Sequence, residues 1–177
     1  GLFYTKDTNK PYSGPVFTLS EDGQKKEEGS LKDGKMISKT KWKWYKNGQK
    51  SSEATYKDDK RDGLWASWYE NGQKSSERIY KDGEIDGLDI YWYINGQKYR
   101  EITYQDGELI NEIYWTEDGL DYGELIFYFK NGEIWKKGNL KDGKRDGENT
   151  YYDKNGKIYW KGIYKDDVLV NETSFIG

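Results

Sequence analysis

The chain has 177 residues, a formal net charge of −3, and neither Cys nor His. Without Cys the chain has no disulfide, thiol nucleophile or thiolate metal site, and without His it lacks the commonest acid–base residue. Acidic and basic residues are interleaved rather than gathered in a basic block, which argues against nucleic acid as a partner. No apolar run is long enough to span a bilayer. Aromatic residues make up 17% of the chain, which favours strands, because aromatic side chains pack well on a pleated surface.

Turn signals recur along the chain with a period close to 24 residues, except for one interval of 13. The first series of Asn-Gly or Asp-Gly steps ends at Gly23, Gly48, Gly72, Gly96, Gly119, Gly132 and Gly156. A second series lies at Gly34, Asp59, Gly83, Gly107, Gly143 and Asp167. The runs between these turns are short and rich in Tyr, Trp, Ile and Thr, which is typical of β-hairpins.

We therefore expect an all-β protein with an elongated antiparallel β-meander of tandem hairpin repeats. The expected sheet has about 15 strands and is open, twisted or rolled, in the manner of a solenoid. A single repeat array covers residues 1–177. The repeat at 111–122 is short by about one strand, which predicts a bend, bulge or change of face near residues 111–123 and allows two sub-blocks, 1–110 and 123–177. The strands at the two ends expose edges through which copies of the chain could associate.

The repeat positions also predict how side chains divide between the two faces of the sheet. Trp44, Trp68 and Trp92 lie four residues before a turn glycine, whereas Tyr56 and Tyr80 lie eight residues after one. A three-residue loop with glycine in a left-handed bulge would place both sets on one face. We expect that Trp-lined face to be the concave core, with small residues opposite the Trp side chains at Gly29, Ala54, Gly138 and Gly162.

The other face mixes aromatic and charged residues, as a solvated sheet face does. Its aromatic residues are the candidate binding residues, because Tyr and Trp are favoured at interfaces. They are Tyr45, Tyr69, Tyr91, Tyr93, Tyr99, Phe127, Phe129, Trp135 and Tyr159. Cross-strand pairing that only stabilises the sheet is the alternative explanation of the same residues.

Three other repeated sets have a structural explanation beside a chemical one. Glu53, Glu77 and Glu101 recur at one position and could form a carboxylate pair, but they recur because the unit recurs. The turn aspartates could form a calcium ladder, but Asp is preferred in such turns for its local hydrogen bonds. The Trp series could stack on sugars or form the core. We predict no catalytic residue, no metal site and no cofactor.

The unit G-x-W-x-x-W-Y-x-N-G-Q-K followed by Y-K-D-G-x-x-D-G, most complete from Gly63 to Gly87, resembles the bacterial variant of the MORN repeat. The resemblance covers nearly the whole chain, and it departs from the family pattern at Asp59, Asn111 and Asp167 and at the truncated unit. Because Asn and Asp tolerate left-handed geometry, we expect those turns to survive. The resemblance implies a β-meander scaffold for protein association, similar to the YwqK-type antitoxin family or to surface and secreted arrays of host-associated bacteria.

The function predicted from the sequence is a non-catalytic repeat scaffold that binds another protein. The partner would be a toxin, in an antitoxin or immunity role, or a host or envelope protein, in a surface or secreted role. A secreted or cell-surface location is favoured over the cytoplasm. The rival function is binding of cell-wall or host glycans through the aromatic strips, since the hairpins also resemble choline- and glucan-binding repeats.

Overall fold

The computed structural model of the protein describes residue 6 and residues 9–117 and 123–175. These residues form fourteen β-strands in one sheet, and the strand order in the sheet follows the chain order. The predicted all-β, open antiparallel meander is thus confirmed. The described residues include no helix that is long and apolar enough to cross a membrane. The chain divides into two compact units, Gly1–Ile85 and Asp86–Gly177.

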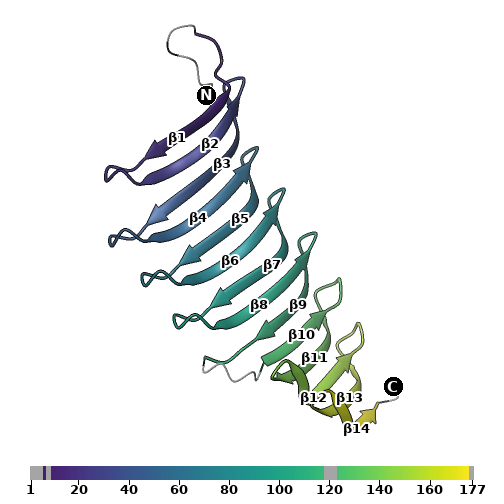
Figure 1. The fold of residues 1–177 in the computed structure, drawn as a ribbon. Coiled ribbons are helices and arrows are strands. Elements are labelled where there is room, and N and C mark those ends of the chain that lie inside the picture. The colour runs from purple at the N-terminus through teal and green to yellow at the C-terminus, as the bar shows by residue number, and fades with distance from the viewer. Residues whose placement is uncertain (1–5, 7–8, 118–122, 176–177) are drawn as a thin grey trace. The chain divides into compact units, whose positions relative to one another are not determined.

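The first unit contains six antiparallel strands that lie side by side (Figure 1). They are β1 (Gly14–Leu19), β2 (Lys25–Lys32), β3 (Lys35–Trp44), β4 (Lys50–Lys57), β5 (Lys60–Trp68) and β6 (Lys74–Lys81). Strand β7 (Glu84–Trp92) begins at the end of this unit and continues into the second.

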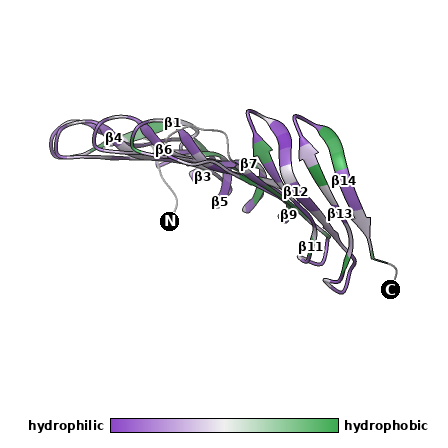
Figure 2. Cartoon of the chain, turned by 90° about the horizontal axis from the view of Figure 1, so that it is seen from below, coloured by the Kyte–Doolittle hydropathy of each residue, from purple (hydrophilic) through white to green (hydrophobic). Residues whose placement is uncertain are grey.

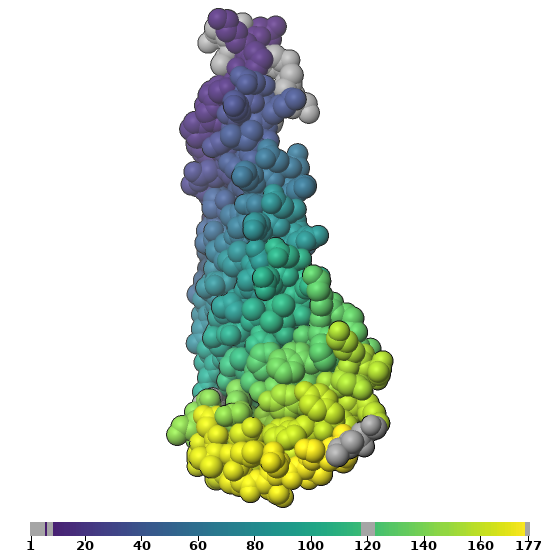
Figure 3. Space-filling model, turned by 90° about the vertical axis from the view of Figure 1, so that its right-hand side faces the viewer, coloured from purple at the N-terminus to yellow at the C-terminus, as the bar shows by residue number. Residues whose placement is uncertain are grey.

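The second unit continues the same pairing from β7 onward. Its further strands are β8 (Lys98–Gln105), β9 (Glu108–Tyr114), β10 (Gly123–Tyr128), β11 (Ile134–Lys141), β12 (Lys144–Tyr152), β13 (Ile158–Lys165) and β14 (Val168–Ser174). Every residue of β14 is exposed. The space-filling view shows the side chains of this unit as successive rows that follow the chain order (Figure 3).

The first series of turns has the predicted three-residue loop wherever the structure describes it; the turn at Gly119 lies outside the described residues. In the turn after β3, the amide of Tyr45 donates to the carbonyl of Gln49 at 2.8 Å, and the amide of Gly48 donates to the carbonyl of Tyr45 at 3.0 Å. Gly48 has a φ of +85°, a left-handed conformation that glycine adopts without steric cost. The prediction of a left-handed glycine bulge is therefore confirmed.

Besides the glycine bulge, the strand that follows this loop contains a second irregularity, which no residue type in the sequence indicates. Trp44 pairs with Lys50, but Lys43 pairs with Ser52, so Ser51 is an extra residue in β4. The same one-residue shift follows the turns at Gly23, Gly72, Gly96, Gly132 and Gly156. The pairs between β9 and β10 show no such shift. Because one extra residue reverses the alternation of side chains, Tyr56 lies opposite Lys39 and not on the face of Trp42. The prediction of a shared Trp and Tyr face is wrong for this reason.

The second series of turns has two-residue loops. Asp33 and Gly34 have φ values of +49° and +75°, and the flanking Lys32 and Lys35 pair directly. Two left-handed residues in a two-residue hairpin loop define a type I′ turn. Asp59 and Asp167 replace glycine here with φ values of +60° and +68°, which confirms that these turns survive. Asn111, in contrast, is a paired residue of β9 and not part of a turn.

The register defines two faces in each unit. In the first unit, the Trp42 face holds Thr40, Trp42, Glu53, Ala66 and Glu77, and the Tyr56 face holds Lys39, Ala54, Tyr56, Trp65, Arg78 and Tyr80. In the second unit, the Ile113 face holds Ile90, Glu101, Ile113, Leu125, Phe127 and Tyr151, and the Ile102 face holds Asp89, Tyr91, Ile102, Glu112 and Ile126.

Burial is shared between the two faces. Ala66 on the Trp42 face and Tyr80 on the Tyr56 face are both buried, whereas Trp42, Trp44 and Trp68 are only half-buried. The predicted Trp-lined core is therefore wrong, because the described strands form a single layer that leaves both faces partly in water. The hydropathy colouring accordingly alternates along the strands of the second unit (Figure 2).

The truncated repeat changes the face that each repeat position occupies. Before it, Ile90 pairs with Glu101, and Glu101 pairs with Ile113, so that equivalent isoleucines share a face. After it, Ile113 pairs with Leu125, and the equivalent Ile126 pairs with Glu112 on the other face. The predicted change of face is confirmed. A predicted bend or bulge at residues 118–122 lies outside the described residues.

Candidate binding surface

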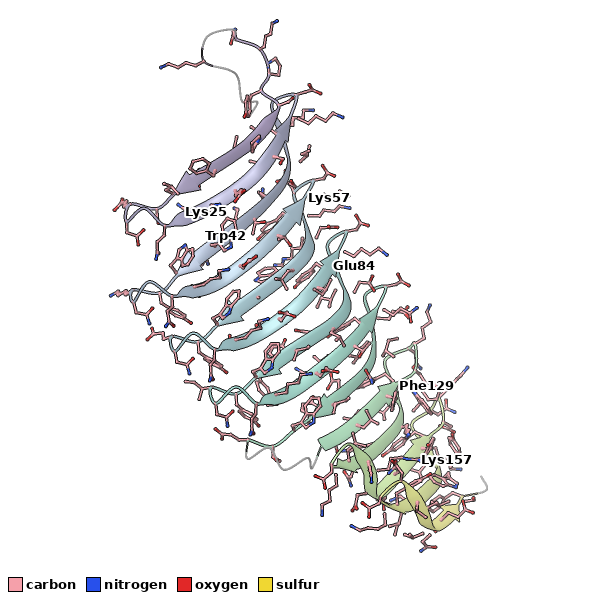
Figure 4. All side chains as sticks on the ribbon, viewed as in Figure 1. Lys25, Trp42, Lys57, Glu84, Phe129 and Lys157 are labelled. Carbon is pink, nitrogen blue, oxygen red and sulfur yellow. The ribbon has the colours of Figure 1, made fainter. Side chains whose placement is uncertain are left out.

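The recurring glutamates lie on strands that follow a turn of the first series. Each of them forms an ion pair with a lysine of its own strand. The distance between Lys Nζ and Glu Oε2 is 2.5 Å for Lys25–Glu28, 2.6 Å for Lys50–Glu53 and 2.7 Å for Lys98–Glu101, and Lys74 pairs with Glu77 in the same way. Lys25, Lys50 and Lys98 also lie above Trp rings, with Lys50 Nζ 5.0 Å from the ring centroid of Trp68 on the next strand. Figure 4 shows Lys25 beside Trp42 in the equivalent place. The contacts give these glutamates a structural role between repeats.

The turn aspartates have a structural role as well. Asp33, Asp58, Asp82, Asp106, Asp142 and Asp166 have φ values between +47° and +52°. This is the left-handed conformation that Asp tolerates better than most residues. Within residues 6, 9–117 and 123–175, no group of three or more acidic residues is arranged to hold a metal ion.

Three of the predicted binding residues occupy one position beside the first series of turns. The hydroxyl of Tyr45 donates to the carbonyl of Trp68 at 2.6 Å, and that of Tyr93 donates to the carbonyl of Trp115 at 3.3 Å. Tyr69 occupies the equivalent position and is half-buried. The tyrosines at this position therefore bond one hairpin to the next. Phe129 stands at the same point after β10, where its amide donates to the carbonyl of Glu133 at 2.7 Å.

A second group, Tyr91, Tyr93 and Tyr99, forms a ring cluster on the Ile102 face. The centroid of Tyr99 lies 5.8 Å from that of Tyr91 and 4.9 Å from that of Tyr93. The hydroxyl of Tyr91 donates to Asp89 Oδ2 at 3.0 Å, and the guanidinium of Arg100 lies 5.8 Å from the Tyr91 ring. This cluster thus continues into a set of buried charges.

Glu112 is the centre of that set and is only 6% exposed. It accepts hydrogen bonds from Arg100 Nη2 at 2.9 Å and from the hydroxyl of Tyr114. Burial, followed by the hydrogen bond to Glu112, raises the pKa of the Tyr114 hydroxyl to about 12. Glu112 thus has a partner for each carboxylate oxygen, although Arg100 Nε has none, and this part of the Ile102 face makes mainly internal contacts.

The remaining predicted residues form part of a continuous aromatic strip on the Ile113 face. The strip consists of Phe127 on β10, Trp135 on β11, Tyr151 on β12, and Tyr159 and Trp160 on β13. Successive ring centroids are 5.4 Å apart for Phe127 and Trp135, 5.8 Å for Trp135 and Tyr151, and 5.0 Å for Tyr151 and Trp160.

The extra residue after each turn builds this strip. Trp135 and Tyr159 are the residues skipped by the register shifts of their hairpins, as Ser51 is in the first unit. The shift places Trp135 on the face of Phe127 and Tyr159 on the face of Tyr151. Phe127 and Tyr151 each lie five positions before the turn glycine. Aromatic residues at these extra positions therefore add a ring to the row without leaving the sheet.

The strip is partly open to solvent and carries a positive charge. Tyr159 is 47% exposed, and the other four rings are half-buried. Lys136 Nζ lies 5.4 Å from the ring centroid of Phe127 and 5.3 Å from that of Tyr151. Burial among these rings, followed by the charge of Arg145, lowers the pKa of the Lys136 ammonium. At one end of the strip, Trp160 Nε1 donates to Glu172 Oε2 at 3.0 Å.

The nine predicted residues therefore do not form one surface. Within the second unit, Tyr91, Tyr93 and Tyr99 lie on the Ile102 face, and Phe127, Trp135 and Tyr159 lie on the Ile113 face, because the truncated repeat exchanges the faces. The sequence analysis missed Tyr151 and Trp160, which complete the strip. Tyr151 could have been found, since it occupies the same repeat position as Tyr91 and Phe127.

The arrangement of strands and turns agrees with the comparison to known families. The sequence profile of the MORN repeat variant matches residues 41–58, 61–82, 121–142 and 145–174, which together exceed half of the chain. The protein therefore belongs to the family of MORN repeat variant proteins.

Comparisons with individual proteins give less. No curated protein matches the chain. Among solved structures, a chain of "Crystal Structure of TcdB2-TccC3-Cdc42" aligns at 14% identity and a TM-score of 0.28, covering 92% of this chain and 10% of that one. The protein thus spans about a tenth of the length of the chain it matches there.

Proposed function

We propose that the protein is a non-catalytic scaffold that binds another protein through the aromatic strip of β10–β13. The observation that carries this proposal is the row of five rings on one face, with Tyr159 exposed and the others half-buried. Aromatic side chains supply large, rigid contact area at interfaces and dominate the energy of binding there. A cation at the centre of the strip, Lys136, adds a charge that a partner can pair with.

The geometry of the rings favours a protein partner over a glycan. The ring planes of Trp135 and Tyr151 meet at 62°, and those of Tyr151 and Trp160 meet at 84°. In such edge-to-face pairs the face of one ring is covered by the edge of the next. A sugar stacks on an open ring face, and the exposed Tyr159 is the best candidate for one. Glycan binding is therefore the second candidate.

Two more specific roles for such a scaffold rest on the family resemblance. One form is an antitoxin or immunity role, in which the partner is a toxin. The other is a secreted or surface role, in which the partner is a host or envelope protein. Co-expression with a toxin encoded beside the gene would support the first form if the protein restored growth.

The strip is tested by comparing the proteins that the wild type and Tyr159→Ser recover from lysate of the source cells, using quantitative mass spectrometry. A partner held by the strip should lose at least about thirty-fold in affinity, because truncating an interface aromatic costs about 2 kcal/mol or more. Tyr45→Phe is the control, since it removes only a structural hydroxyl. Equal recovery by Tyr159→Ser and the wild type would show that the strip is not the binding surface, and a strong glycan-array signal would favour the second candidate.

A further inference from the structure

A hollow of about 320 Å³ lies on the Tyr56 face of the first unit, across β5 and β6. Its lining residues are Arg61, Trp65, Ser67, Ser76, Arg78 and Tyr80. Ser67 and Ser76 face each other across the two strands, as do Trp65 and Arg78. The hollow is thus lined by hydrogen-bond donors and two aromatic rings, and no acidic side chain lines it.

Arg61 is held in a fixed position in this hollow. Its guanidinium carbon lies 4.0 Å from the ring centroid of Trp65 and 5.2 Å from that of Tyr80. Its Nη1 donates to the hydroxyl of Tyr80 at 3.2 Å, and Arg78 Nη1 donates to the same oxygen at 3.3 Å. Among the residues that the structure describes, Arg61 has no carboxylate partner. Stacking on rings orders a guanidinium without neutralising its charge.

The same local arrangement occurs in the second unit, where it is complete. The guanidinium carbon of Arg145 lies 4.1 Å from the ring centroid of Tyr164, as Arg61 lies over Tyr80. Arg145 Nε donates to Asp167 Oδ1 at 3.0 Å. The amide of Asp167 donates to the carbonyl of Arg145 at 2.9 Å, and the amide of Gly83 donates to the carbonyl of Arg61 at 2.8 Å. Gly83 therefore occupies the position of Asp167, and the carboxylate that Arg145 receives from its own repeat is missing at Arg61.

We propose that this hollow binds a carboxylate side chain from an acidic segment of a partner protein, with Arg61 as its principal ligand. The incoming carboxylate takes the place that Asp167 fills beside Arg145. Arg61 offers further N–H donors of its planar fork, and charge-assisted bonds of this kind are stronger than neutral ones. Ser67 and Ser76 add hydroxyl donors to the lining of the hollow.

The charge around the hollow favours a segment with several acidic residues. Lys39, Lys41 and Lys43 lie on the same face, on β3. Asp59 pairs with Lys39 at 2.6 Å and Glu27 with Lys41 at 3.5 Å. Lys43 and Arg61 have no carboxylate partner among the described residues and keep this face positive, so an acidic chain gains from extending across it. The hollow and the aromatic strip share no residue and lie in different parts of the sequence. This proposal therefore does not depend on the proposed function.

The test is a fluorescence-anisotropy titration of the full chain with a fluorescein-labelled peptide of ten glutamates, with a ten-glutamine peptide as the neutral probe. At low ionic strength the wild type should bind the glutamate peptide and not the glutamine peptide. Arg61→Gln should weaken binding about ten-fold, the usual value of one charge-assisted hydrogen bond. Lys43→Gln removes the same charge from the same face and should weaken it less than about two-fold, as for an exposed charge pair.

Gly83→Asp is the sharpest variant, because it keeps every cation and supplies an internal carboxylate. Asp59 and Asp167 adopt φ values of +60° and +68° at this turn position, so the turn accepts Asp once the φ of residue 83 falls from +102° towards these values. Gly83→Asp should weaken peptide binding as much as Arg61→Gln, and Asp167→Gly, which frees Arg145, should add a second binding site. Circular dichroism and thermal melts confirm that each variant is folded.

Several results would overturn the proposal. The wild type could fail to bind the glutamate peptide, or Arg61→Gln and Lys43→Gln could weaken it equally, which would indicate a diffuse electrostatic effect. Gly83→Asp could leave binding unchanged in a folded protein. Displacement of the peptide by a lower concentration of inorganic phosphate, or of a DNA oligonucleotide, would identify a phosphate site instead.

Discussion

Gly29 marks a point where β2 and β3 come too close for any side chain. A Cβ atom at this position would lie 2.4 Å from the carbonyl oxygen of Ser38 and 3.2 Å from the Cα of Lys39. The small residue is therefore required by the backbone of the neighbouring strand, and not by a Trp side chain as its repeat position had suggested. Single residues of this kind decide how closely the strands of the sheet approach.

Gly29→Ala should accordingly lower the free energy of unfolding by about 1–3 kcal/mol, the usual cost of forcing atoms into a filled space. Urea denaturation measures this. Lys32→Ala is the control, because Lys32 is an exposed residue of the same strand. If the two variants lost equal stability, the close approach at Gly29 would not be the cause.

Tyr114 should make the stability depend on pH in the alkaline range. Its pKa is raised to about 12 in the folded protein from 10.0, so the folded state holds the proton more tightly than the unfolded state. The stabilising effect is fully present below pH 10 and is lost as the pH rises towards 12. Two pKa units correspond to at most about 2.7 kcal/mol. Tyr114→Phe should flatten this part of the curve of unfolding free energy against pH, and an unchanged curve would contradict the assignment.

The hairpin is the element that organises the protein, and its extra residue is as important as its turn. Ser51, Trp135 and Tyr159 occupy this extra position in three hairpins. Each sets which residues of the following strand share a face with the preceding strand. Its own side chain is free to vary, since the first unit has Lys26, Ser51 and Ser75 at this position where the second has aromatic residues.

Removing Ser51 should therefore damage the first unit far more than replacing it. Its deletion would turn Glu53 to the Tyr56 face and Ala54 and Tyr56 to the Trp42 face, which separates Glu53 from Lys50 and breaks the register. We expect a loss above about 3 kcal/mol or failure to fold, because buried residues change faces. Ser51→Tyr should change stability by less than about 1 kcal/mol. Thermal melts of both variants test this, and equal effects would show that the residue count at this point is unimportant.

At the scale of the molecule, the chain behaves as a row of repeats in which each strand contacts its neighbours. Such arrays gain stability from each repeat and from each interface between repeats. Loss or gain of a whole repeat preserves the faces, whereas loss of a single strand exchanges them, as the truncated repeat demonstrates between Ile113 and Ile126. The exchange separates the Tyr91 cluster from the aromatic strip.

Deletion of residues 50–73 removes one whole repeat and joins Gln49 to Lys74, which recreates the Asn-Gly-Gln-Lys sequence of the neighbouring turns. We expect a folded protein with a smaller denaturant m-value, since less surface is exposed on unfolding. Deletion of residues 50–62 removes about one strand and should cost more stability despite its smaller size. The hypothesis of additive repeats would be wrong if the longer deletion were the more harmful.

Much of the fold could be predicted because its signals are local. The Asn-Gly and Asp-Gly steps identify the turns, and a count of strands predicted a bend, bulge or change of face at the truncated repeat, of which the structure shows the change of face. The extra residue at Ser51 could not be predicted, because Lys-Ser-Ser carries neither the glycine nor the proline that marks a break in a strand. The extra residue of each hairpin sets the register and so decides which side chains meet in the candidate sites. The complete aromatic strip and the unpaired Arg61 could therefore not be predicted.

The sequence by itself determined the family of the protein and the β-meander, since both follow from residue types and spacings along the chain. It also predicted the three-residue loops, and it left a bend, a bulge or a change of face open at the truncated repeat. Only the tertiary structure decided which side chains share a face and which are buried. One extra residue reverses every later side chain of a strand, and a single-layer sheet leaves both faces half-exposed. Contacts such as Arg145 with Asp167, or the missing partner of Arg61, follow from register between strands, which local sequence does not specify.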